Sequence, residues 1–143
     1  MHFDKPPRDR HASISMVAMP RDTNALGDIF GGWLMSHADI AGAILAYRRA
    51  GGRVVTVAVN DFVFIAPVFV GDLVSFYTDI AHIGRTSIRV DVSMLAESDW
   101  GGHDDAHCVA TATMTYVHVD ERRRPVKVRD LGETRAQKVS TRI

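Results

Sequence analysis

Residues 31–49, GGWLMSHADIAGAILAYRR, are the stretch that decides the fold, because they predict one long helix in a chain otherwise patterned like strands. The stretch is apolar on nearly every side, and glycines at positions 51 and 52 end it. Arg48 and Arg49 fall in the last turn, where positive charge suits the helix dipole. A helix that is apolar nearly all round is expected to be buried against other elements.

The segments around this helix predict strands. Residues 12–19 alternate apolar and polar side chains before it, and residues 53–59, dense in β-branched side chains, predict a buried strand after it. Gly84-Arg85 is expected to form a two-residue type II′ hairpin turn, with positive φ at Gly84. The remaining candidates are residues 62–69, an edge or irregular segment around Pro67, and the alternating segments 72–83, 86–97 and 107–119. One helix against antiparallel strands predicts an α+β fold, with the sheet curved around the helix.

The composition is typical of a soluble, single-domain protein. The 143 residues are expected to form one domain over 1–143, with a loose arm at 1–11 and a charged tail from about 120 to 143. Because 17 basic residues balance 17 acidic ones, the charge predicts neither nucleic acid nor a membrane as a partner. The one cysteine, Cys108, cannot form an internal disulfide, and no segment resembles a signal peptide or a membrane span. These features favour the cytoplasm.

One carboxylate, Asp39, lies in the middle of the predicted helix. At roughly 100° per residue, most residues within about 60° of it are small, whereas the opposite side is bulkier. No arginine or lysine lies three or four positions away, and an unpaired carboxylate is costly to bury. Asp39 is therefore either a functional group open to a cleft or a structural group held by a distant arginine or by backbone amides. The flanking residues are Gly32, Met35, Ser36, Gly42, Ala43 and Ala46, and the opposite ones are Trp33, Leu34, His37, Ala41, Ile44 and Leu45.

The start of the helix is rich in glycine. Gly27, Gly31 and Gly32 offer backbone amides at a helix N-terminus, where the dipole favours a developing negative oxygen, although turn chemistry and tight packing also account for glycines. Gly32 and Asp39 share a face but lie roughly 10 Å apart along the axis, too far for one carbonyl group to contact both easily. An antiparallel helix from a second subunit would bring its Gly32 near Asp39. A two-fold homodimer with composite sites is therefore expected.

The run from Met19 to Asp39, MPRDTNALGDIFGGWLMSHAD, resembles the signature of hotdog acyl-CoA thioesterases of the YciA branch. The similarity continues in the segments 53–59, 64–68, 70–72 and 84–88, and spans roughly residues 14 to 119. It implies a hotdog fold, an antiparallel sheet wrapped around one long central helix, and hydrolysis of acyl-CoA to a free acid and coenzyme A. It also implies that no metal or other cofactor is needed, and that dimers assemble into a hexamer as a trimer of dimers.

The resemblance assigns roles to individual residues. Asp39 corresponds to the family's catalytic acid, and Asn24, with the amides of Gly31 and Gly32, corresponds to its substrate-polarising end. Further substrate contacts are expected at Phe30, and near the phosphates of coenzyme A at Gly84, Arg85, Thr86 and Ser87.

Thioester hydrolysis by Asp39 has two forms, and the sequence leaves both open. Asp39 can act as a general base on water, or it can attack the carbonyl carbon and form a mixed anhydride that water then opens. Arg85 and the run 122–124 can meet the phosphates of coenzyme A, although the same charges suit a solvated turn and tail. No metal is expected, because the spacing of the histidines His82, His103, His107 and His118 is not that of metal ligands.

Two other functions fit the same fold. A non-catalytic acyl-CoA-binding or regulatory module would use the site without turnover. A dehydratase acting on hydroxyacyl thioesters would need a histidine that converges on the acid. His37 lies about 200° from Asp39 on the helical wheel, so it is expected to be a core or interface histidine.

Overall fold

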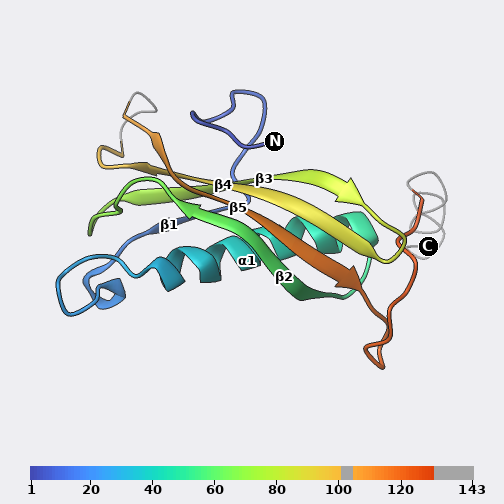
Figure 1. The fold of residues 1–143 in the computed structure, drawn as a ribbon. Helices are drawn as coiled ribbons and strands as arrows, with labels where there is room; N and C mark the ends of the chain where they lie inside the picture. Colours follow the sequence, from blue (N-terminus) through green and yellow to red (C-terminus); the bar gives the residue numbers. More distant parts are fainter. Residues whose placement is uncertain (101–104, 131–143) are drawn as a thin grey trace, which may run out of the picture.

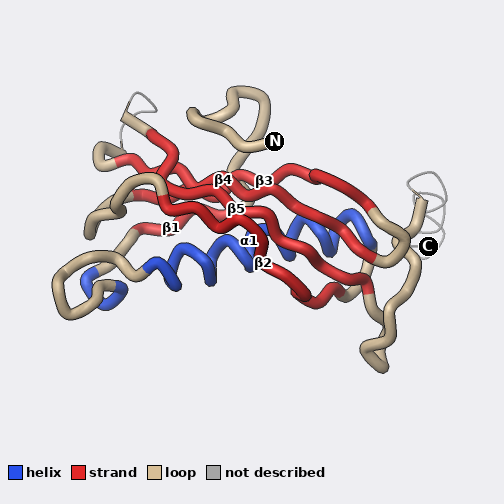
Figure 2. The backbone as a smooth tube through the Cα atoms, in the orientation of Figure 1, coloured by secondary structure: helices blue, strands red, loops and turns tan. Residues whose placement is uncertain are grey.

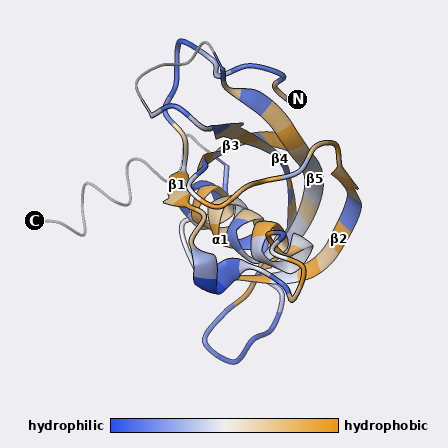
Figure 3. Ribbon diagram, turned by 90° about the vertical axis from the view of Figure 1, so that its left-hand side faces the viewer, coloured by the Kyte–Doolittle hydropathy of each residue, from blue (hydrophilic) through white to orange (hydrophobic). Residues whose placement is uncertain are grey.

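The fold is an antiparallel sheet wrapped around one long helix, as predicted, in a computed structural model that describes residues 1–100 and 105–130. The elements are β1 (Ile14–Val17), η1 (Pro20–Asp22), α1 (Gly31–Ala50), β2 (Val54–Phe64), β3 (Leu73–Ile83), β4 (Ser87–Glu97) and β5 (His107–His118). The strands lie in the order β1-β3-β4-β5-β2, and each neighbouring pair is antiparallel. The sheet curves around α1, which lies along its concave face (Figures 1 and 3).

The helix α1 ends one residue beyond its predicted end. Gly51 caps it in the left-handed region, with φ 73°, and the Gly51 N–H donates to the Tyr47 carbonyl at 2.7 Å. A residue with a Cβ is strained at this φ, which explains why a glycine ends the helix.

The face of α1 that packs on the sheet consists mostly of small side chains. This corrects the helical wheel, which places Gly42 and Ala46 on the open flank beside Asp39, because both are buried. Small residues let the helix backbone approach the sheet closely, whereas Ile44 and Leu45 are only partly buried. The buried residues of α1 are Leu34, Ala38, Ala41, Gly42, Ala46 and Ala50.

The core lies between α1 and the concave face of the sheet. The alternation in residues 86–97 correctly predicts its inward side chains, since Ile88, Val90, Val92 and Met94 have no exposed surface. Phe76 of β3 and Tyr116 of β5 are equally buried. These large side chains make the central strands a rigid support for α1.

β2 is an exposed edge strand, and the prediction of a buried strand at 53–59 is wrong. Among the described residues it pairs with β5 alone, and two irregularities shift its register, after Thr56 and after Asn60. Val57 and Val59 are 54% and 42% exposed. β-Branched side chains favour an extended backbone but do not determine how many neighbours a strand has. An apolar edge of this kind is a ready template for pairing with another chain.

The connection from β3 to β4 is longer than the predicted two-residue turn. Residues 84–86 connect β3, which ends at Ile83, to β4, which begins at Ser87, and the Gly84 N–H donates to the Ser87 carbonyl at 2.8 Å. The type II′ prediction is wrong, because the glycines with positive φ are others in the chain. Residues 84–86 therefore join the two strands without a positive φ.

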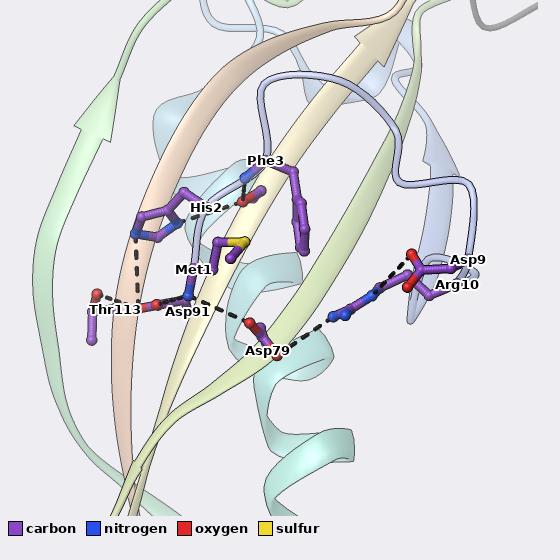
Figure 4. A network of polar contacts seen from close by, with 9 residues as sticks. Met1, His2, Phe3, Asp9, Arg10, Asp79, Asp91 and Thr113 are labelled. Carbon is purple, nitrogen blue, oxygen red and sulfur yellow. Dashed lines mark hydrogen bonds and ion pairs between the residues drawn. The ribbon is translucent and has the colours of Figure 1, made fainter.

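Residues 1–11, predicted to be a loose arm, lie over the convex face of the sheet (Figures 2 and 4). The Phe3 N–H donates to Ser93 Oγ at 2.8 Å, and Lys5 Nζ donates to the Ala106 carbonyl at 3.0 Å. Figure 4 shows the ion pairs of this segment, which join the Met1 amino group to Asp79 and Asp91, His2 to Asp91, and Arg10 to Asp9 and Asp79. The arm therefore covers the side of the sheet opposite α1.

Residues 120–130, the described part of the predicted charged tail, turn back along the sheet. Val128 is 4% exposed, and its N–H donates to the Arg85 carbonyl at 2.7 Å. The rest of that tail, 131–143, and His103 in the loop after β4 lie outside the described residues. Within the described ranges, no helix has the length and apolarity that a membrane crossing requires.

Candidate active site

Asp39 lies near the middle of α1, within reach of the edge strand β2. Its carboxylate Oδ1 accepts a hydrogen bond from Thr56 Oγ1 at 2.7 Å. Asp39 is half-buried and Thr56 is exposed, so the carboxylate keeps access to solvent. In residues 1–100 and 105–130, the ion pairs all involve other carboxylates. The alternative of a structural aspartate held by a distant arginine therefore has no support among these residues.

A second contact holds the backbone of the same residue. Tyr116 Oη donates to the Asp39 carbonyl at 2.8 Å. Thr56 and Tyr116 are cross-strand partners in the β2–β5 ladder, so both point toward α1. Burial, and then the negative charge of the Asp39 carboxylate, raise the pKa of Tyr116 well above its ordinary value, so the hydroxyl keeps its proton and donates.

The sequence did not indicate either partner of Asp39. Thr56 lies 17 residues away and Tyr116 lies 77 residues away, beyond any helical spacing. Only the register of β2 against β5 would have placed them beside Asp39.

The flank of α1 beyond Asp39 is open on the side away from the sheet. Gly32 and Ser36 are exposed, and Met35 and Ile40 are 39% and 50% exposed. A Cβ added at Gly32 would meet no atom within 4 Å. The space beside Gly32 is therefore open within the chain.

The N-terminus of α1 presents backbone donors. Phe30 is the N-cap residue, its side chain is 52% exposed, and no side chain caps the helix among the described residues. The amides of Gly31 and Gly32 therefore remain available to a negative oxygen. Gly32 and Asp39 both lie in α1, and their separation of seven residues corresponds to roughly 10 Å along the helix axis.

Asn24 lies in the loop that leads to this helix N-terminus. Its Oδ1 accepts hydrogen bonds from the N–H groups of Leu26, at 2.9 Å, and Asp28, at 3.1 Å. The side-chain oxygen thus shapes the loop, and the side-chain NH₂ is the group that remains to polarise a substrate.

An apolar cavity of about 380 Å³ lies beside the helix N-terminus. A Cβ on Gly31 would stand 2.9 Å from the Phe64 ring, so glycine is required there for the ring to approach the helix. The lining residues that the sequence did not indicate include Ile29, Phe64 and Ile65. An apolar hollow next to free amides suits an acyl chain attached to a polarised carbonyl.

A second apolar cavity, of about 420 Å³, lies toward the C-terminal half of α1. Its lining combines Ile40, Ala43 and Tyr47 of α1 with two cations, Arg48 and Arg53. The α1 residues that line this cavity begin with Ile40, directly after Asp39. The α1 residues that line the first cavity all come before Asp39.

The segment 84–87, predicted to meet the phosphates of coenzyme A, lies between β3 and β4 at the end of the fold opposite the N-terminus of α1 (Figure 1). The Arg85 carbonyl binds the segment that carries Arg129, and the Arg129 guanidinium fills the space beside Gly51. A helix of 20 residues spans about 30 Å. Within one chain, the structure therefore does not bring the two predicted groups of substrate contacts together.

His37, expected to be a core or interface histidine, is partly buried against aromatic side chains. Its ring centroid lies 4.6 Å from that of Trp33 and 5.9 Å from that of Phe76, and its Nδ1 is 2.8 Å from the Trp33 carbonyl oxygen. These contacts hold the ring away from Asp39, so His37 does not supply the histidine that a dehydratase would need. Within residues 1–100 and 105–130, no group of three His, Cys, Asp or Glu side chains is arranged to hold a metal ion.

Several known proteins similar to this chain are thioesterases, and some of them are named as acyl-CoA hydrolases. Residues 26–100 match the family model of the thioesterase superfamily. The acyl-CoA thioester hydrolase YciA of Escherichia coli is 46% identical over 113 residues, which cover 78% of this chain and 86% of that protein. A hexameric hotdog fold thioesterase of Campylobacter jejuni superposes with a TM-score of 0.79 at 39% identity, covering 86% of this chain and 93% of that one.

An acyl-CoA hydrolase from Staphylococcus aureus, solved with butyryl coenzyme A and coenzyme A, is a more distant relative. It has a TM-score of 0.75 and 27% identity, and covers 90% of this chain and 84% of that one. In one further structure of this hydrolase an aspartate is changed to alanine, and in another a threonine is changed to alanine. These two positions lie 17 residues apart. The same 17 residues separate Asp39 from Thr56.

Proposed function

The chain belongs to the thioesterase superfamily and is an acyl-CoA thioester hydrolase, and we propose that Asp39 is the group that cleaves the thioester. The observation that carries this proposal is the Asp39 carboxylate, bonded to Thr56 at 2.7 Å and open to the uncovered flank of α1. A carboxylate with one oxygen bonded and the other free can accept a proton or attack a carbon.

The reaction adds water across the bond between the acyl carbon and sulfur. Asp39 either removes a proton from the attacking water or forms a mixed anhydride, which water then opens. In both routes the carbon–sulfur bond breaks and the coenzyme A sulfur leaves as a thiolate that takes up a proton. In the general-base route the acyl carbon gains the water oxygen; in the anhydride route it first gains an Asp39 oxygen, and water then breaks one carbon–oxygen bond of the anhydride to release the acid and restore the carboxylate. Neither route needs a metal or another cofactor.

Thr56 is proposed to orient Asp39 for this step. Its hydroxyl donates to one carboxylate oxygen and leaves the other to face the substrate. The spacing of the altered aspartate and threonine in the Staphylococcus aureus hydrolase supports this pairing of roles.

The active site is proposed to be shared by two copies of the chain. The exposed edge of β2, 11 residues long, can pair with β2 of a second copy about a two-fold axis. With the two helices antiparallel, the amides of the partner's Gly31 and Gly32 would stabilise the oxyanion beside Asp39, and Asn24 would act at the same end. An oxyanion donor of this kind contributes on the order of 10²–10³-fold to the rate.

The rest of the substrate is proposed to run from this point to both ends of the helix pair. The hollow lined by Ile29 and Phe64 would take the acyl group. The phosphates of coenzyme A would meet Arg48 and Arg53, or the Gly84–Ser87 turn with Arg85. Hexameric relatives support a trimer of dimers, and a coenzyme A substrate, with one unpaired cysteine, supports the cytoplasm.

Acyl-CoA turnover in the presence of a thiol-reactive dye tests the proposal. The intact protein is mixed with acyl-CoAs of several chain lengths, and free thiol, free acid and new unsaturation are measured. Thiol and acid released in equal amounts by the wild type and not by Asp39→Asn support the proposal. Binding without release would indicate a non-catalytic module, and new unsaturation would indicate a dehydratase.

Mixed dimers test the shared site separately. Asp39→Asn removes the carboxylate, and Gly32→Val obstructs the helix N-terminus, so each variant alone is expected to be inactive. If one site uses Asp39 of one copy and Gly32 of the other, coexpression restores about a quarter of the wild-type activity, because half of the dimers are mixed and each holds one intact site. Verified mixed dimers without activity would contradict the shared site but not the role of Asp39.

A further inference from the structure

Tyr116 holds the turn of α1 that carries Asp39. Its side chain is fully buried, and its hydroxyl reaches from β5 to the Asp39 carbonyl at 2.8 Å. Residues in the middle of a helix already bind one N–H at their carbonyl, so this contact is an additional one on the second lone pair. The contact ties the backbone of residue 39 to the rigid centre of the sheet.

A glycine in α1 makes room for this hydroxyl. A Cβ added at Gly42 would overlap Tyr116 Oη and lie 3.1 Å from two carbons of the ring. Gly42 is buried, and it lies inside a helix, where glycine is less favourable than alanine. The close approach of the hydroxyl gives a physical reason for the glycine at this position.

The two contacts of residue 39 come from facing positions of adjacent strands. Thr56 of β2 binds its carboxylate, and Tyr116 of β5, the cross-strand partner of Thr56, binds its carbonyl. One contact fixes the side chain and the other fixes the backbone from which the side chain projects. Together they leave the carboxylate little freedom to move relative to the sheet.

We propose that Tyr116, seated over Gly42, is a positioning residue that sets where the Asp39 carboxylate stands during turnover. This inference rests on the proposed role of Asp39 in thioester cleavage. A small displacement of a reacting group can cost a large factor in rate, so a contact that never touches the substrate can affect the chemical step. The hydroxyl itself stays protonated, and it neither gives nor takes a proton in the reaction.

The variant Tyr116→Phe tests the proposal, because it keeps the ring in the core and removes only the hydroxyl. The expected result is a fall in kcat of roughly tenfold with KM changed less than about twofold, since the contact acts on the reacting carboxylate and not on substrate binding. The unfolding midpoint is expected to fall by no more than about 5 °C, because the helical hydrogen bond of the Asp39 carbonyl remains.

Tyr77→Phe is the matched control. Tyr77 is also buried, at 6% exposure, but it lies on β3 and has no hydrogen bond from its hydroxyl among the described residues. It is expected to keep the wild-type kcat. Wild-type kcat in Tyr116→Phe, or equal losses in both variants, would overturn the inference. Full activity in Asp39→Asn would instead contradict the proposed function on which it rests.

A double-mutant cycle with Gly42→Ala gives a second test. The added methyl group would displace the Tyr116 hydroxyl, so this variant alone is expected to lose kcat at least as strongly as Tyr116→Phe. In the Tyr116→Phe background the same change should cost much less, because the hydroxyl is already absent. If Gly42→Ala lowers kcat by the same factor in the wild type and in Tyr116→Phe, the proposed coupling is contradicted.

Discussion

Replacing Thr56 by valine isolates the hydrogen bond that holds the Asp39 carboxylate. The change keeps the shape of the side chain and removes Oγ1, which donates to Asp39 Oδ1 at 2.7 Å. Thr56 is exposed on an edge strand and valine suits extended backbone, so the free energy of unfolding should fall by no more than the roughly 1–1.5 kcal/mol that the lost bond contributes, and the protein should stay folded. The effect on turnover can therefore be measured in a folded variant.

The expected size of the effect follows from the charge and the exposure of the pair. A hydrogen bond to a charged group contributes about 1.5–3 kcal/mol where water is excluded. Because Thr56 is exposed and Asp39 is only half-buried, water replaces part of the lost bond, which leaves about 1–1.5 kcal/mol. That loss corresponds to a fall in kcat of about five- to tenfold, with KM little changed.

The measurement is thiol release at saturating acyl-CoA, with thermal unfolding of each variant in parallel. Thr56→Ser keeps a hydroxyl and should recover most of the rate. Thr115→Val is the control, because Thr115 precedes Tyr116 on β5 and therefore faces the opposite side of the sheet. The reasoning is refuted if Thr56→Val turns over at the wild-type rate, or if Thr56→Ser loses as much activity as Thr56→Val.

Three further results are expected from the same structure. Gly51→Ala should lower the free energy of unfolding, measured by urea titration, by about 1 kcal/mol or more. Gly51 has φ 73°, and a Cβ there would overlap the Arg129 guanidinium. An unchanged free energy of unfolding would contradict this description of the helix end. Burial, followed by the charge of Asp39, raises the pKa of Tyr116, so the folded state holds this proton more tightly than the unfolded state. The contribution of this proton to the free energy of unfolding should be fully present below pH 10.0, the ordinary pKa of tyrosine, and should be lost as the pH rises above that value. In a comparison of unfolding between about pH 9 and pH 11, Tyr116→Phe should therefore show a smaller fall in stability than the wild type. Burial, together with the charge of Asp4, also raises the pKa of the Cys108 thiol. A thiol-reactive dye should therefore label Cys108 slowly at about pH 8 in the folded protein and quickly once urea unfolds it. Fast labelling of the folded protein would contradict the burial of this thiol.

The parts of the fold that were predictable are those set by local periodicity. The helix over 31–49 and the inward side chains Ile88, Val90, Val92 and Met94 follow directly from spacings of 3.6 and 2 residues. A glycine in the left-handed region at position 51 ends the helix where the sequence indicated. In each case the signal lies within a few residues of the feature that it specifies.

The errors arose where the outcome depends on distant neighbours. The composition of residues 53–59 indicates an extended segment, but only the strand order reveals an edge. The helical wheel groups Gly42 with Asp39 because both lie on one side, yet Gly42 is covered by Tyr116, a residue far along the chain. The small side chains of α1 indicate close packing, and they do not distinguish packing against the sheet from an opening to substrate.

The candidate site was predictable in its central residue but not in its support. Asp39 stands out as the single carboxylate of an apolar helix, and the resemblance to a known family names it independently. Thr56 and Tyr116, which hold it, become neighbours only through the register of β2 against β5.

The most direct test of the role of Asp39 is thiol release by Asp39→Asn, measured together with binding of coenzyme A. Asparagine keeps the size of the side chain and an oxygen that can accept the Thr56 hydrogen bond, but it loses the basicity and nucleophilicity of the carboxylate. Turnover should fall by on the order of 10²–10⁴-fold, while the affinity for coenzyme A and the unfolding midpoint stay close to those of the wild type. Thiol release by a folded, binding-competent Asp39→Asn at the wild-type rate would contradict the assignment of Asp39 to the chemical step.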